Sequence, residues 1–91
     1  MGREVTLFSS KETKSSSEIA TFLRDLASRL EAGQVTLRRG TDEIVLNLPE
    51  TLVLELKVED EEKRHKGPQH SLEVELKWYD GMAPTDPVQL G

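Results

Sequence analysis

Apolar and charged residues alternate along two stretches of the chain, residues 52–59 and residues 72–78. Successive side chains of a β-strand point to opposite faces, so each stretch predicts a strand with one buried face and one solvent-exposed face. The two stretches look alike because neighbouring strands of one half-buried antiparallel sheet share this pattern. Residues 60–70 between them are charged and contain Gly67 and Pro68, which predicts a flexible hairpin loop and leaves open how far the strands extend into it.

A different spacing in the first half of the chain predicts one amphipathic α-helix over residues 16–32. Ser15 and Glu18 have the spacing of a capping box at its start. Gly33 can take the left-handed conformation that ends a helix. Apolar residues recur at helical spacing and form one stripe, which consists of Ile19, Phe22, Leu23, Leu26 and Leu30.

Three further segments predict strands. Residues 34–39 and 44–48 alternate and are joined by a short turn, and Pro49 presets the bend that follows them. Residues 4–10 predict a first strand before the helix, with Val5 and Leu7 on one face.

The fold class that follows is α+β, with the element order β-α-β-β-β-β. We expect a largely antiparallel meander sheet with one helix packed on one face. A right-handed crossover would place the first strand parallel to a later one, such as residues 34–39, but its position in the sheet stays open. One domain over residues 1–80 and a flexible C-terminal tail over residues 81–91 complete the prediction.

The predicted sheet has more apolar surface than one helix can cover. A helix of about 17 residues is about 25 Å long and roughly 10 Å wide, whereas five strands at about 4.8 Å spacing make a surface more than about 20 Å across. Either the sheet curls around the helix or a second copy covers the remainder, and we favour a homodimer formed through the uncovered apolar strip or a strand edge. The predicted inward positions are Val5, Leu7, Val35, Leu37, Ile44, Leu46, Leu48, Leu52, Leu54, Leu56, Val58, Leu72, Val74, Leu76 and Trp78.

The opposite face of the predicted sheet is rich in Lys and Glu, which can pair across neighbouring strands. A solvated face explains these charges, and a binding platform around Val45, Val53 and Tyr79 is the alternative. We expect Trp78 to anchor the core at the rim of the sheet.

No set of residues has the pattern of a catalytic or metal site. His65 and His70 match no structural zinc spacing. The glutamates alternate with lysines, whereas a general acid needs a buried carboxyl group with a raised pKa. Helix capping explains Ser15, and the glycines form no phosphate-binding loop. We therefore expect no enzymatic activity and assign no catalytic, cofactor-binding or metal-binding residues.

The amino-acid composition limits which kinds of binding partner and which cellular compartment we expect for this chain. The net charge of −5 argues against a nucleic-acid partner. The absence of cysteine excludes disulfides and thiolate metal sites and favours the cytoplasm. The chain has neither an apolar run of about 18 residues nor a signal-peptide core, so we expect a soluble protein without a membrane partner. Residues 1–6 fit an N-myristoylation pattern but run into the predicted first strand.

The element order and the run from Leu72 to Trp78 resemble the amphi-Trp domain family of small prokaryotic proteins. The resemblance extends to residues 17–20, to the helix end at residues 30–33 and to the turn at residues 48–50, and it covers roughly residues 3–80. It implies a prokaryotic cytosolic protein, which removes the myristoylation hypothesis. It implies no activity, cofactor or catalytic residue.

The interpretation that results is a small non-enzymatic module that acts through self-association or protein–protein interaction via its sheet. A homodimer is the expected state, and an unidentified protein partner is left open. The alternative is weak binding of nucleic acid or a phosphate ligand through Arg24, Arg29, Arg38 and Arg39.

Overall fold

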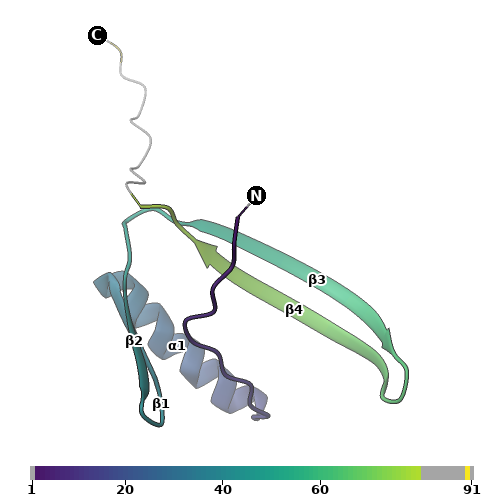
Figure 1. The fold of residues 1–91 in the computed structure, drawn as a ribbon. Coiled ribbons are helices and arrows are strands. Elements are labelled where there is room, and N and C mark those ends of the chain that lie inside the picture. The colour runs from purple at the N-terminus through teal and green to yellow at the C-terminus, as the bar shows by residue number, and fades with distance from the viewer. Residues whose placement is uncertain (1, 81–89, 91) are drawn as a thin grey trace. The chain divides into compact units, whose positions relative to one another are not determined.

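The structure is a computed structural model that describes residues 2–80 and residue 90. Its elements are α1 (Ser16–Ala32), β1 (Gln34–Arg39), β2 (Asp42–Asn47), β3 (Val53–Lys63) and β4 (Gly67–Lys77) (Figure 1). The α+β class and the order of one helix followed by four antiparallel strands are confirmed. The chain divides into two compact units, of which the first ends at Leu48 and the second begins at Pro49.

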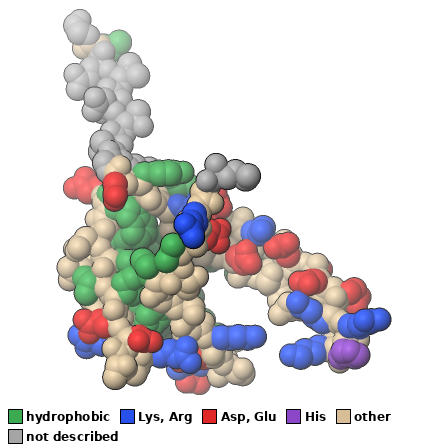
Figure 2. Space-filling view, in the orientation of Figure 1, with side chains coloured by type: hydrophobic (Ala, Val, Ile, Leu, Met, Phe, Trp, Pro, Cys, Tyr) green, Lys and Arg blue, Asp and Glu red, His purple; other side chains and the backbone are tan. Residues whose placement is uncertain are grey.

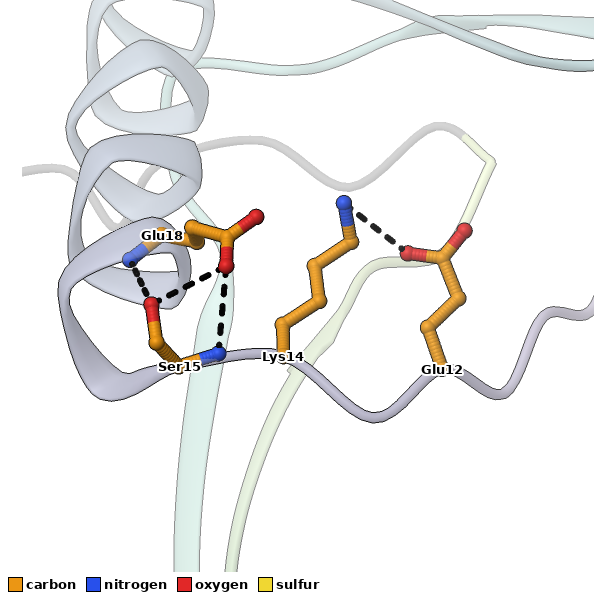
Figure 3. A network of polar contacts seen from close by, with 4 residues as sticks. All are labelled: Glu12, Lys14, Ser15 and Glu18. Carbon is orange, nitrogen blue, oxygen red and sulfur yellow. Dashed lines mark hydrogen bonds and ion pairs between the residues drawn. The ribbon is translucent and has the colours of Figure 1, made fainter.

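The helix begins and ends at the predicted residues. Ser15 Oγ accepts a hydrogen bond from the Glu18 backbone N–H at 3.1 Å, and the Glu18 carboxylate accepts one from the Ser15 N–H at 3.4 Å (Figure 3). Gly33 has φ 84° and donates its N–H to the Leu30 carbonyl at 3.1 Å. A residue with a Cβ is strained at this φ, which explains the glycine.

A small antiparallel hairpin packs against the helix in the first unit. β1 and β2 pair over their full length, with Val35 opposite Leu46 and Leu37 opposite Ile44, and α1 contacts β1. Val35 is 3% exposed and is the one buried hydrophobic side chain in the described part of the chain. The core of this unit therefore lies between α1 and β1.

A longer antiparallel hairpin makes up the regular structure of the second unit. β3 and β4 pair from Val53 opposite Lys77 to Lys63 opposite Gly67, and residues 64–66 form the turn. The strands thus extend through most of the predicted loop. Lys66 N–H donates to the Lys63 carbonyl at 3.4 Å, and Gly67 has φ 76° where the turn ends.

The predicted first strand at residues 4–10 is wrong, because residues 2–15 form neither helix nor strand. Val5 and Leu7, which were expected inside, are 71% and 74% exposed. A strand needs a neighbour for its backbone hydrogen bonds, and among the described strands the free edges of β1 and β2 pair with no further segment. Arg39 Nη1 donates a hydrogen bond to the Ser9 carbonyl in this segment at 3.2 Å.

The single meander sheet is also corrected. The described strands form two separate two-stranded sheets, β1–β2 and β3–β4, and β2 does not pair with β3. Pro49, in the connection between them, has no backbone N–H to donate to a ladder. Alternation of side chains shows which face a residue lies on but not which strand lies beside it, so it could not detect this division.

The predicted C-terminal tail at residues 81–91 lies, apart from Leu90, outside the described residues. In the part of the chain that is described, no helix is long and apolar enough to cross a membrane.

Candidate interaction surfaces

One face of the β3–β4 hairpin is apolar and exposed. Directly opposite residues of an antiparallel pair point to the same face, and three consecutive pairs on one face are apolar. These six residues, called here the hairpin apolar face, are Leu54 opposite Leu76, Leu56 opposite Val74 and Val58 opposite Leu72. Leu76 is half-buried, but the other five are between 60% and 74% exposed. The structure thus confirms that they share a face, and five of the six predicted inward positions are exposed in the single chain.

The other face of the same hairpin is charged. The hairpin charged face consists of Glu55, Lys57, Glu59, Glu73, Glu75 and Lys77, in which four carboxylates and two ammonium groups give a net charge of −2. Figure 2 shows Lys, Arg, Asp and Glu side chains along the hairpin. The two sides of one hairpin therefore differ sharply in polarity.

The lysines of the hairpin charged face lie between carboxylates. Glu55 and Glu75 are directly opposite each other, an arrangement of like charges that is unfavourable alone. Lys77 Nζ lies 2.6 Å from Glu55 Oε1 and 3.5 Å from Glu75 Oε1, and Lys57 Nζ lies 3.3 Å from Glu59 Oε1. The lysines thereby offset the repulsion.

These contacts change the ionisation of the charged face. The hydrogen bond and positive charge of Lys77 lower the pKa of Glu55, and the hydrogen bond to Glu55 raises the pKa of Lys77. Likewise, the hydrogen bond to Glu59 raises the pKa of Lys57. A lowered carboxyl pKa keeps Glu55 ionised, which is the opposite of what a general acid needs.

On the side of the hairpin apolar face, the next pair toward the turn is polar. Asp60 and His70 are directly opposite each other, and His70 Nδ1 lies 2.7 Å from Asp60 Oδ1. This contact was not predicted from the sequence, because the alternation of side chains does not give the register that places the two residues opposite each other. His65 lies in the turn, so the two histidines occupy different positions of the hairpin. Among the described residues, no group of three or more His, Cys, Asp or Glu could hold a metal ion.

The first unit contains an open groove of about 890 Å³ between the N-terminal segment, α1 and β1. Apolar side chains of α1 and β1 line it, and so do Arg29, Arg38 and Arg39, but Arg24 does not. Arg38 Nε lies 2.7 Å from Glu43 Oε2, and Arg39 contacts the backbone as described above. Acidic residues line the same groove, namely Glu12, Glu18 and Asp25. The predicted arginine set is therefore only partly brought together, and its surroundings are of mixed charge.

The family model of the Amphi-Trp domain matches residues 1–90 of the chain. The chain belongs to the Amphi-Trp domain family. No curated protein and no solved structure matches it. The resemblance based on the alternating run that ends in Trp78 is thus confirmed.

In this Amphi-Trp domain, Trp78 directly follows β4 and is half-buried. It lines a shallow pocket of about 270 Å³ together with Leu76, Lys77 and Tyr79. The predicted platform of Val45, Val53 and Tyr79 does not form one sheet face, because Val45 belongs to β2 and Val53 to β3 of a different sheet.

Proposed function

We propose that this Amphi-Trp domain is a non-enzymatic interaction module that self-associates or binds a protein through the hairpin apolar face. The observation that supports the proposal is the exposure of three consecutive apolar cross-strand pairs on one side of β3–β4. Contiguous exposed apolar surface of this kind is typical of protein–protein interaction sites. A prokaryotic cytoplasm, where no disulfide is needed, is the compartment we infer for it.

The hairpin itself supplies a second argument. A two-stranded hairpin is marginally stable in water unless a further element covers one of its faces. Burying a valine or leucine side chain contributes about 1.5–3 kcal/mol. Five of the six residues of the hairpin apolar face are more than half exposed, so a partner on this face would stabilise the hairpin considerably.

Sedimentation velocity over a range of concentrations, with a matched pair of variants, tests the proposal. Leu56→Glu places a charge in the middle of the hairpin apolar face. Val53→Glu makes a similar change on the opposite side of the same strand, where Lys77 lies directly opposite. We expect Leu56→Glu to weaken self-association or partner binding and Val53→Glu to leave it unchanged. Equal behaviour of both variants and the unmodified chain would contradict the proposal.

Binding of nucleic acid or a phosphate ligand through Arg24, Arg29, Arg38 and Arg39 is the alternative. Three of these arginines line one groove, which favours it. Arg38 is paired with Glu43, three acidic residues line the same groove, and the chain has a net charge of −5, all of which weaken attraction to phosphate. Titration with single-stranded DNA at low salt distinguishes the two, because only the alternative expects Arg29→Ala to reduce binding.

A further inference from the structure

We infer that the partner of the hairpin apolar face is a second copy of the same face, packed against it with the two hairpin turns at opposite ends. This inference rests on the proposed function and adds the identity and the orientation of the partner. The symmetry is that of an isologous dimer, in which one surface contacts its own copy across a two-fold axis.

The charge distribution selects this face for contact between identical chains. Each copy has a net charge of −5, and the hairpin charged face has a net charge of −2, so two charged faces repel each other. The three pairs that form the hairpin apolar face include no charged side chain. Two copies can therefore approach through this side of the hairpin without burying an unpaired charge.

The available area is enough for a weak dimer. From the exposed fractions, and at about 100 Å² for a fully exposed Leu or Val side chain, the face presents roughly 300 Å² of apolar surface per copy. Apolar atoms make up about 60% of a typical interface, so the total buried area would be about 1,000 Å². This value is at the lower limit for a specific interface. We accordingly expect a dimer that dissociates on dilution.

The residues beyond the apolar pairs decide the orientation. Asp60 and Glu62 lie on the apolar side of β3, between Val58 and the turn. With both turns at the same end, β3 of one copy would lie over β4 of the other, and Asp60 and Glu62 of both copies would gather at one end of the interface. Four carboxylates close together are unfavourable. With the turns at opposite ends and the axis at the Leu56–Val74 pair, they lie outside the apolar overlap.

The two-fold axis at the Leu56–Val74 pair then predicts which residues of the two copies face each other. Leu56 and Val74 lie on the axis and face the same pair of the second copy. The Leu54–Leu76 pair of each copy faces the Val58–Leu72 pair of the other copy. All six residues of each apolar face are thus covered by six residues of the other.

A spin-label distance measurement tests the orientation on an unmodified apolar face. The chain has no cysteine, so Arg64→Cys gives one label, and it lies in the turn. Residue 64 is eight residues from the axis, so at about 3.4 Å per residue the two labels of a dimer are about 55 Å apart. Turns at the same end would give a distance below about 25 Å. Glu55→Cys, on the hairpin charged face near the axis, is the control, because its label distance changes little between the two orientations.

The outcomes separate the inference from the proposed function. A dimer with the long distance, which Leu56→Glu weakens by about 100-fold and Val53→Glu does not, supports the inference. A dimer with the short distance, or a dimer that Leu56→Glu does not weaken, overturns it.

A chain that stays monomeric at millimolar concentration also overturns the inference. The rate of amide hydrogen exchange in β3 of that monomer then tests the proposed function. Rapid exchange of the hairpin amides leaves the face available to another protein. Strong protection in the monomer shows that the face is covered within one chain and ends the proposed function as well.

Discussion

His70 and Asp60 face each other across the β3–β4 hairpin, with His70 Nδ1 2.7 Å from Asp60 Oδ1. The pair lies on the same side of the hairpin as Leu56 and Val74, closer to the turn. Its side chains are 72% and 74% exposed, so water competes for the contact. The apolar pairs therefore end at this contact, and the contact itself adds little to the stability of the hairpin.

We expect Asp60→Asn to lower the free energy of unfolding by less than about 1 kcal/mol, because exposed polar side-chain contacts contribute about 0–1 kcal/mol. His70→Gln should have an equally small effect. A double-mutant cycle in urea denaturation measures the coupling between the two residues. A coupling energy well above 1 kcal/mol would show that the pair is shielded from water.

The contact between Lys77 and Glu55 on the hairpin charged face predicts a measurable change in ionisation. Lys77 lowers the pKa of Glu55, so Lys77→Met should move this pKa up toward its ordinary value. An NMR titration of the side-chain carboxyl carbons measures the change. Lys63→Met is the control, because Lys63 pairs with Glu61 near the turn at 3.1 Å and should leave Glu55 unaffected. An unchanged pKa of Glu55 in Lys77→Met would contradict the geometry.

The same contact gives stability a defined pH dependence. The pKa of Glu55 is lowered in the folded chain, so its contribution is present at neutral pH and is lost as the pH falls through that lowered value. The pKa of Lys77 is raised, so its contribution is lost only as the pH rises through the raised value. The difference in stability between the unmodified chain and Lys77→Met should therefore shrink at both acidic and strongly alkaline pH.

The helix and the faces of the strands could be predicted because local patterns determine them. The capping box of Ser15 and Glu18 and the left-handed Gly33 mark both ends of α1. The alternation in β3 and β4 predicted which residues share a side, including Leu56 and Val74.

The predictions that were wrong concern contacts between segments that are distant in the sequence. A strand at residues 4–10 needed a neighbour, and the single sheet needed β2 to pair with β3. An uncovered apolar strip was expected, but alternation shows only that a side is apolar, so it could not identify which of the inward positions stay exposed. The Asp60–His70 contact required the register of the hairpin, which no local pattern contains.

The cap at Ser15 should contribute measurably to the stability of the first unit. Ser15→Ala removes the hydroxyl that accepts from the Glu18 N–H, and such a loss costs about 1 kcal/mol. Thermal unfolding followed by helical circular dichroism measures the effect. Ser16→Ala, one residue later at the first position of α1, is the matched control and should have little effect. If both substitutions destabilise equally, capping is not the cause.

The core of the first unit should depend on Val35 far more than on Val45. Val35 is 3% exposed, whereas Val45 is 46% exposed on the opposite side of the same β1–β2 sheet. Val35→Ala removes two buried methyl groups and should lower the free energy of unfolding by about 2 kcal/mol. Val45→Ala changes the same atoms at an exposed position and should cost less than about 0.5 kcal/mol. Urea denaturation of both variants compares the two positions directly. Equal losses would mean that Val45 is covered as well, so that this sheet has a partner on both of its sides.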